Sequence, residues 1–235
     1  MQRSRNVSKV SGLESVSTLT ILDSKGRERV RKTAMASKEF DQGRTEKRII
    51  RFLEPADVSG IGMLIFDYEN DSDNMWIYMP ALRKTRRIVN SDKSKNFMGS
   101  EFSNADMTAS NIDDFTYHYL GEEEINDQLC FKIEIQPINE DIADENGFSK
   151  KISFIDRDSY VLRKSLYYDL DGELLKILVA QKFKIIDEKN GKYLATEMTM
   201  ENIQNGRKSI MKMENVQFNP NVRDDYFTIR YLEKR

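Results

Sequence analysis

The sequence has very few of the residues on which disulfide, metal and nucleophile chemistry depend. Its 235 residues include one cysteine, Cys130, and one histidine, His118. A single cysteine forms no internal disulfide, which fits a reducing compartment or a secreted protein without cross-links. One residue of each type is too few for the usual zinc sets, and no motif of a nucleophile pair surrounds them. We therefore expect no catalytic residue, no metal and no cofactor.

Features typical of several other protein classes are also absent. No run of eighteen apolar residues is present, so the sequence predicts no membrane-spanning helix. The glycines of Gly60-Ile-Gly62 lack the Lys-Ser/Thr ending of a phosphate-binding loop. The acidic turns at 69–74 and 169–172 lack the glycine and distal glutamate of a calcium loop. The net charge of −2 argues against a nucleic-acid partner.

The start of the chain, Met1–Asn6, shows no apolar segment of a signal peptide. Two alternatives stay open: a cytoplasmic protein, or a mature form from which a signal peptide was removed. The sequence has no internal repeat and no Pro- or Gly-rich linker, so we predict one domain over 1–235. Residues 1–15 are polar, and we expect a flexible or truncated N-terminal segment there.

What the chain does contain is a series of short strand-like segments separated by Asn-, Asp- and Gly-rich turns. Their spacing predicts a mainly β antiparallel meander, hence a barrel or a strongly curved sheet. Between them, only 103–114 reads as a short helix. The predicted strands are 16–22, 27–36, 47–53, 60–68, 75–79, 115–120, 129–136, 151–155, 161–168, 174–183, 193–200 and 208–218.

Along several of these strands, polar and apolar side chains alternate, which predicts one wet face and one apolar face. With so little helix to cover the apolar face, we expect the sheet to curl over it. The interior is then either filled by side chains or left as a cavity for a ligand. Eleven methionines are equally consistent with gap filling and with a surface that accepts varied apolar shapes; beside a helix-poor sheet they favour a lipid pocket.

The stretch from 74 to 107 has the least usual composition. In the strand before Pro80, Trp76 and Tyr78 share one face, and neither face is polar. The following loop carries Phe97, Met98 and Phe102, although a simple connection is normally polar. Large apolar groups in a loop need a cover, which is either the protein's own core or a hydrophobic guest.

Four cations, Arg83, Lys84, Arg86 and Arg87, fall within five residues of this stretch. Because they occupy both faces of a strand, at least one is expected to cover apolar surface with its stem or to line a mouth. One interpretation is ion pairing with the acidic loops. The other is contact with an anionic head group or an acidic partner.

Two blocks of this stretch resemble the outer-membrane lipoprotein-sorting family, the LolA-like proteins. The blocks are Trp-Ile-Tyr-Met-Pro-Ala-Leu-Arg-Lys-Thr-Arg-Arg-Ile at 76–88 and Asn-Phe-Met-Gly-Ser-Glu-Phe-Ser-Asn-Ala-Asp-Met at 96–107. The segments 23–29, 52–57, 60–62 and 167–176 are similar to the same family, so the resemblance runs from about Ser17 to Leu232. It implies an unclosed antiparallel β-barrel with short helical lid segments and a hydrophobic cavity. The family usually begins with an amphipathic helix, for which this chain has little room.

The resemblance implies a non-enzymatic periplasmic carrier that binds lipoprotein acyl chains or other lipids for transport to the outer membrane. The expected partners are an inner-membrane transporter or an outer-membrane acceptor, and a monomer is favoured. The alternative is a packed β-barrel module that docks on a membrane transporter or envelope protein through Arg83, Lys84, Arg86 and Arg87. For the carrier, the expected cavity or mouth residues are Trp76, Tyr78, Phe97, Met98, Phe102 and Met107.

Overall fold

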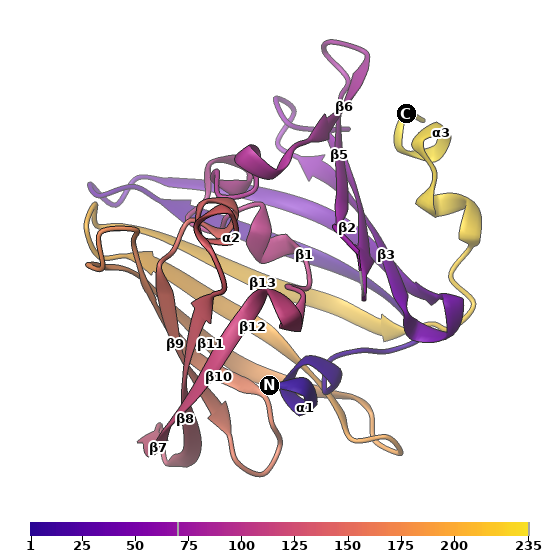
Figure 1. The fold of residues 1–235 in the computed structure, drawn as a ribbon. Helices are drawn as coiled ribbons and strands as arrows, with labels where there is room; N and C mark the ends of the chain where they lie inside the picture. Colours follow the sequence, from indigo (N-terminus) through magenta and orange to yellow (C-terminus); the bar gives the residue numbers. More distant parts are fainter. Residues whose placement is uncertain (70, 235) are drawn as a thin grey trace. The chain divides into compact units, whose positions relative to one another are not determined.

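The computed structural model describes residues 1–69 and 71–234, and within these ranges it contains thirteen strands of one antiparallel sheet (Figure 1). The strand order is β6-β5-β4-β3-β2-β1-β13-β12-β11-β10-β9-β8-β7, so each strand pairs with its neighbours in sequence and β1 pairs with β13. Among the described residues β6 and β7 are edge strands, and the sheet is therefore not closed. The strands are β1 Gly12–Leu22, β2 Glu28–Phe40, β3 Thr45–Glu54, β4 Gly62–Tyr68, β5 Asn74–Met79, β6 Lys84–Ile88, β7 Phe115–Ile125, β8 Gln128–Pro137, β9 Lys150–Asp156, β10 Leu162–Tyr168, β11 Leu174–Asp187, β12 Lys192–Asn202 and β13 Arg207–Phe218.

Helices are few and short in the described part of the chain. None of them is long and apolar enough to cross a membrane. The prediction of a mainly β, unclosed antiparallel sheet with short helical segments is confirmed. The α-helices are α1 Gln2–Asn6, α2 Glu140–Asn146 and α3 Ile229–Leu232, and the 3-10 turns are η1 Asp41–Gly43, η2 Asn90–Asp92, η3 Phe97–Gly99, η4 Ala105–Met107, η5 Ile112–Asp114 and η6 Asp224–Phe227.

Two local predictions need correction. The helix predicted over 103–114 is wrong, because only the separate turns η4 and η5 form there. The next α-helix along the chain is α2. The side chain of Asn139 accepts a hydrogen bond from the backbone N–H of Ile142 and caps the N-terminus of this helix. Gly147 ends α2 in the left-handed conformation, with a φ of 74°. At the N-terminus, β1 already begins at Gly12, four residues before the predicted strand.

The chain divides into two compact units. The first unit comprises Met1–Lys9, Ile21–Glu28 and Asn90–Met211, and the second comprises Val10–Thr20, Arg29–Val89 and Lys212–Arg235. Strands β7–β12 lie in the first unit and β3–β6 in the second, while β1, β2 and β13 contribute to both. The single domain predicted over 1–235 stays a prediction.

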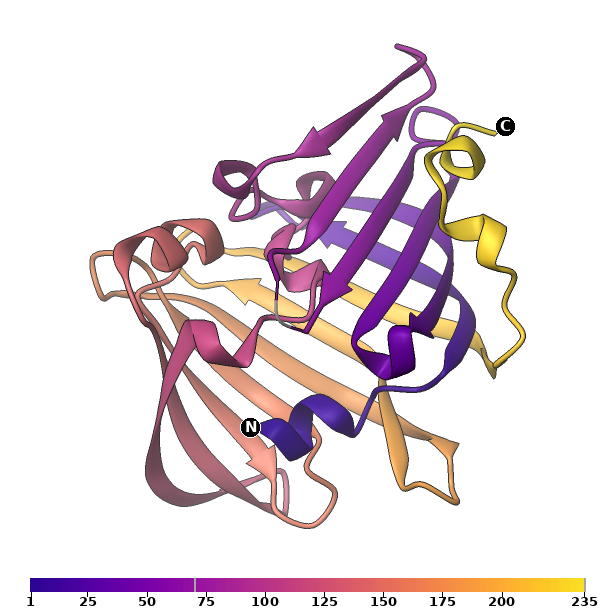
Figure 2. The same ribbon diagram turned by 45° about the vertical axis from the view of Figure 1, so that its right-hand side comes forward.

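In the second unit, one face of β2–β5 packs against the C-terminal segment, residues 219–234, which Figure 2 shows in yellow beside β3 and β4. Alignment of Ala36 with Ile49, of Ile49 with Leu64 and of Leu64 with Trp76 puts these side chains in one cross-strand row. The segment covers this face with apolar side chains: Val222, Phe227 and Leu232 are buried, and Tyr226 and Tyr231 are partly buried.

The opposite face of the same strands is also apolar. It presents Phe52 from β3, Met63 and Ile65 from β4, and Met75 from β5, all of which are buried. The register pairs Ile65 with Met75, so these two side chains meet on that face. Strands β4 and β5 therefore carry apolar side chains on both faces, and for β5 the sequence around Trp76 predicts this.

Candidate functional site

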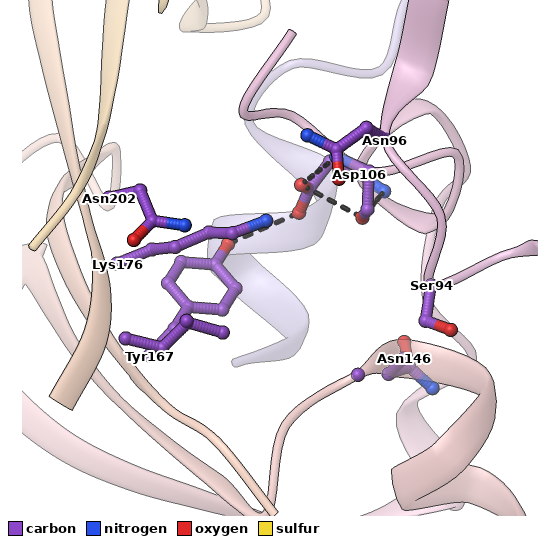
Figure 3. Close-up of a pocket in the computed structure, with 10 residues that line it drawn as sticks. Ser94, Asn96, Asp106, Asn146, Tyr167, Lys176 and Asn202 are labelled. Atoms are coloured by element: carbon purple, nitrogen blue, oxygen red, sulfur yellow. Dashed lines mark hydrogen bonds between the residues drawn. The ribbon is translucent and has the colours of Figure 1, made fainter. Parts of the chain in front are cut away.

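A polar cavity of about 220 Å³ lies in the first unit (Figure 3). The loop after β6 and the C-terminal end of α2 form one side of it, and β10–β12 form the other. Its lining residues are Ser94, Asn96, Ser103, Asp106, Asn146, Gly147, Tyr167, Leu175, Lys176 and Asn202. Most of these residues have polar side chains, so an acyl chain would find few apolar groups to contact here.

The strand side of the cavity is a cross-strand row of polar residues. Tyr167 of β10 is aligned with Lys151 of β9 on one side and with Lys176 of β11 on the other, and Lys176 is aligned with Asn202 of β12. Aligned residues of neighbouring antiparallel strands share a face. Four strands therefore direct two ammonium groups, a phenol and an amide to the same side of the sheet.

Asp106 faces this row from the loop side. Its Oδ2 accepts hydrogen bonds from the backbone N–H of Ser103 at 2.8 Å and from the Ser103 hydroxyl at 2.9 Å. Its Oδ1 accepts a longer hydrogen bond, 3.4 Å, from the hydroxyl of Tyr167. Figure 3 shows Tyr167 and Lys176 pointing toward Asp106. Asp106 is thus fixed in place by the turn that precedes η4.

Burial and the charge of Asp106 shift the pKa values of two residues in this row, Tyr167 and Lys151. Burial, and then the negative charge of Asp106, raise the pKa of Tyr167 well above its usual value. Burial lowers the pKa of Lys151, while the charge of Asp106 acts in the opposite direction. Lys151 also lies over the rings of Phe148 and Tyr167, with its Nζ 5.1 Å and 5.4 Å from the two ring centroids.

A second polar cluster holds the loop that carries Phe97, Met98 and Phe102. Glu101, only 1% exposed, lies 3.0 Å through its Oε1 from Nε of Arg207 and accepts through Oε2 a 3.0 Å hydrogen bond from Asn202. Its backbone N–H donates to the Ser209 hydroxyl at 2.9 Å, and its carbonyl accepts from Nζ of Lys176 at 2.9 Å. The loop is therefore attached to β11, β12 and β13 of its own unit through one buried carboxylate residue.

One wall of the cavity forms where the loop after β6, at Ser94, lies close to the end of α2, at Gly147. A Cβ added at Gly147 would lie 2.9 Å from the Cβ of Ser94, so a larger residue at the end of α2 would push the loop away. An ion pair between Lys93 and Glu145 joins the same two segments. Both partners are largely buried, which fixes α2 against the start of the loop.

The six apolar residues predicted for a cavity or its mouth lie in different units. Trp76 and Tyr78 belong to the second unit and contribute to the core that the C-terminal segment covers. Trp76 also makes an edge-to-face contact with Phe66, with ring centroids 5.1 Å apart. The other four belong to the first unit, where Phe97, Phe102 and Met107 are buried and Met98 is half-buried. None of the six lines the polar cavity, and their role in ligand binding stays a prediction.

The four predicted contact cations lie on or next to β6 and are exposed. Within residues 1–69 and 71–234 none of them forms an ion pair, and Arg87 donates a hydrogen bond to the side chain of Asn74. The ion-pair interpretation is therefore not realised in this part of the structure. The neighbouring Leu82, in the turn between β5 and β6, is 60% exposed. The β5–β6 hairpin therefore exposes the apolar side chain of Leu82 beside these four cations.

The polar residues that form the cavity and anchor its loop are not among the site residues predicted from the sequence. Tyr167 and Lys176 flank the Asp-Leu-Asp-Gly turn at 169–172. The turn and its two strands were predicted, but the alignment of these two residues across the hairpin was not. No sequence signal identifies Glu101, because its partner Asn202 is 101 residues away along the chain. Asp106 could have been suspected from its place three residues after Ser103, a spacing at which serine and aspartate often bond within a turn.

Alkaline titration offers a check of this environment. Burial raises the pKa of Tyr117 to about 12, and the pKa of Tyr167 is also raised. The stabilisation from keeping these phenols neutral is complete below about pH 10 and is lost as the pH rises through their folded pKa values. We expect tyrosinate absorbance to show late-titrating groups that disappear in Tyr117→Phe and Tyr167→Phe. Tyr119→Phe, which removes a 64% exposed phenol, should leave them in place; their survival in the first two variants would contradict the burial.

Comparisons with known proteins agree with this fold. A family model described only as that of an uncharacterized protein matches residues 44–234. A domain described as an outer membrane lipoprotein-sorting protein, from Vibrio parahaemolyticus, is 25% identical with a TM-score of 0.90, covering 99% of this chain and 96% of that one. A DUF1329 family protein from Desulfovibrio piger is 28% identical with a TM-score of 0.90, covering 98% and 95%.

More distant similarity extends to the LolA superfamily. A LolA superfamily protein from Nitrosomonas europaea has a TM-score of 0.72 at 19% identity, covering 98% of this chain and 96% of that one. No curated protein sequence matches the chain. The open antiparallel sheet with short helices therefore defines a LolA-like protein. The chain belongs to the family whose model covers 44–234, and its fold is similar to that of the lipoprotein-sorting domain and of the LolA superfamily protein.

Proposed function

We propose that this protein is a non-enzymatic periplasmic carrier, which binds acyl chains of lipoproteins or other lipids and delivers them toward the outer membrane. The observation that carries the proposal is the match, at a TM-score of 0.90 over 99% of the chain, to a domain described as lipoprotein-sorting. A single cysteine is compatible with that compartment, because the fold does not depend on disulfides.

The second unit contains a buried apolar face of suitable chemistry for acyl chains. Phe52, Met63, Ile65 and Met75 form an apolar face on the side of β3–β5 opposite the C-terminal segment. Each CH₂ group removed from water there contributes roughly 0.8 kcal/mol. Since these side chains are buried in the structure, an acyl chain that contacts them must displace other groups of the protein. The unbranched thioethers of Met63 and Met75 suit such a rearrangement.

Lipid binding by the full-length chain tests the proposal. Native mass spectrometry with lipid extraction, on protein from an envelope fraction, should reveal a co-purifying lipid or acylated peptide. A fluorescent acyl probe should then bind saturably and be displaced by that lipid. Ile77 is aligned with Met63 and is half-buried, so Ile77→Glu should weaken probe binding at least ~10-fold because it places a charge beside the acyl chain.

The matched control is Leu170→Glu, in the turn between β10 and β11, where the leucine is 55% exposed. This variant should bind the probe as the unmodified protein does. Folded protein without bound lipid and without probe binding would overturn the carrier proposal.

That result would favour the second candidate, a module that docks on a membrane transporter or envelope protein. The observation in its favour is the β5–β6 hairpin, where Arg83, Lys84, Arg86 and Arg87 are exposed and form no ion pair in the described part of the chain. Unpaired cations of this kind favour an acidic partner and speed its association at low salt. In a carrier, the same hairpin is the candidate contact with the delivery partner.

A further inference from the structure

Charged and hydrogen-bonding side chains surround the polar cavity of the first unit. Lys176 lines it and Lys151 lies in the same cross-strand row, whereas Asp106 is the one carboxylate among the lining residues. The nearby carboxylate of Glu101 is balanced by Arg207. The side-chain amides of Asn96, Asn146 and Asn202 each donate one hydrogen bond within the protein and have one further N–H, and Ser94 adds a hydroxyl group. An anionic oxygen of a ligand therefore has a partner in Lys176, and a ligand hydroxyl has a partner in Asp106.

Lys176 retains capacity for a ligand. Its ammonium group has three donors, of which one is directed at the carbonyl oxygen of Glu101 at 2.9 Å. This bond holds Nζ at the cavity and leaves two donors for an anionic oxygen. Charge-assisted bonds of this kind are about twice as strong as neutral ones.

Asp106 provides the complementary group. Three donor atoms already hold its carboxylate: the N–H and hydroxyl of Ser103, and the hydroxyl of Tyr167. A carboxylate has about four acceptor positions, so one further donor can be accommodated. A bare anion would meet repulsion from Asp106, whereas a ligand hydroxyl would donate to it.

We propose that this cavity binds a glycerophosphate group, with the phosphate on Lys176 and a neighbouring hydroxyl donating to Asp106. A water molecule occupies about 30 Å³ of liquid, so about 220 Å³ holds roughly seven waters or one small phosphoester. The group is either the head group of a lipid or a free phosphoester. Binding of a lipid head group rests on the carrier function proposed above, whereas binding of a free phosphoester does not.

Direct binding of soluble sn-glycerol 3-phosphate to the full-length chain, by calorimetry and by NMR shifts of the lining residues, tests the cavity itself. We expect saturable binding that is tighter than that of inorganic phosphate or of glycerol. Lys176→Met should weaken it at least ~10-fold, about 1.4 kcal/mol. Asp106→Asn should remove most of the preference for glycerol 3-phosphate over inorganic phosphate.

Two further variants separate ligand binding from folding. Lys176 also binds the loop at Glu101, so Lys176→Met alone could act by loosening that loop. Lys151→Met removes a charge from the same row without touching the loop, and should weaken binding about threefold. Lys189→Met, in the exposed turn between β11 and β12, should leave binding unchanged. Absence of binding, equal affinity in Lys176→Met, or inorganic phosphate binding as tightly as glycerol 3-phosphate would overturn the proposal.

The acyl probe distinguishes the two sources of the group. If glycerol 3-phosphate binds and phosphatidylglycerol in micelles competes with both it and the probe, the cavity binds a lipid head group. If glycerol 3-phosphate binds but the folded protein binds no probe, the cavity binds a free phosphoester and the carrier function fails. If the probe binds and glycerol 3-phosphate does not, the cavity proposal fails and the carrier function stands.

Discussion

Gly62→Ala is expected to destabilise the protein by about 1–3 kcal/mol, although alanine normally stabilises a strand relative to glycine. An added Cβ at Gly62 would lie 2.6 Å from Cδ1 of Leu232, which is closer than packed carbons approach. Leu232 is 0% exposed and closes the C-terminal segment over β4. The segment must therefore shift, or the leucine must leave its rotamer.

Leu232→Ala alone should cost about 2–5 kcal/mol, because it leaves a cavity in the core of the second unit. In that background the added methyl group of Gly62→Ala has room, so the second substitution should become neutral or favourable. Urea unfolding of the two single variants and the double variant measures this coupling. Leu170→Ala, at an exposed leucine, is the control for loss of apolar volume. Additive effects of the two substitutions would contradict the contact between Gly62 and Leu232.

The alternation of polar and apolar residues was enough to predict most of the strands. Predicted strand 129–136 corresponds to β8, Gln128–Pro137, and predicted strand 193–200 to β12, Lys192–Asn202. The turns between them use Asn, Asp and Gly for reasons of local backbone conformation, which a single sequence reveals. Strand ends were less well placed, because charged strand residues such as Lys38 and Glu39 of β2 follow no apolar pattern.

The helix predicted at 103–114 does not form, because turn-forming side chains lie within this segment. Residues 103–114 contain spaced apolar groups, but the side chains of Ser103 and Asp106 bond within a turn and compete with a continuous helix. Asn139, the two acidic residues after it and Gly147 are the N-cap, first turn and C-cap of α2, and all were readable in the sequence.

The candidate site was predicted less well than the fold, and the reason is physical. Trp76 and Tyr78 were predicted as ligand-binding residues because they are large and apolar, and this role stays a prediction. A core uses the same residue types, and the C-terminal segment packs against these two side chains, so residue type alone does not separate the two roles. The polar cavity depends instead on strand register, which brings Lys151, Tyr167 and Lys176 side by side. Register follows from hydrogen-bond pairing, which the residue pattern of a single strand does not contain.

Arg207→Met is expected to lower the free energy of unfolding by about 3 kcal/mol, because it leaves the carboxylate of Glu101 buried without a cation. Arg207 is partly exposed, and the cost comes from the buried partner that remains. The substitution also removes the 2.8 Å hydrogen bond from the guanidinium to the carbonyl oxygen of Gly99. Faster hydrogen exchange is therefore expected over 97–102, together with the lower urea midpoint.

Lys208→Met is the matched control, since its ion pair with Glu201 is exposed on both sides and such pairs contribute about 0–1 kcal/mol. Adding Glu101→Gln to Arg207→Met removes the buried charge while keeping the side chain's size and its capacity to accept from Asn202. The double variant should therefore recover part of the lost stability. If Arg207→Met costs no more than Lys208→Met, or if Glu101→Gln makes it worse, the Glu101–Arg207 pair does not hold this loop. The loop would then depend on the burial of Phe97 and Phe102 and on the backbone hydrogen bonds of Glu101 with Ser209 and Lys176.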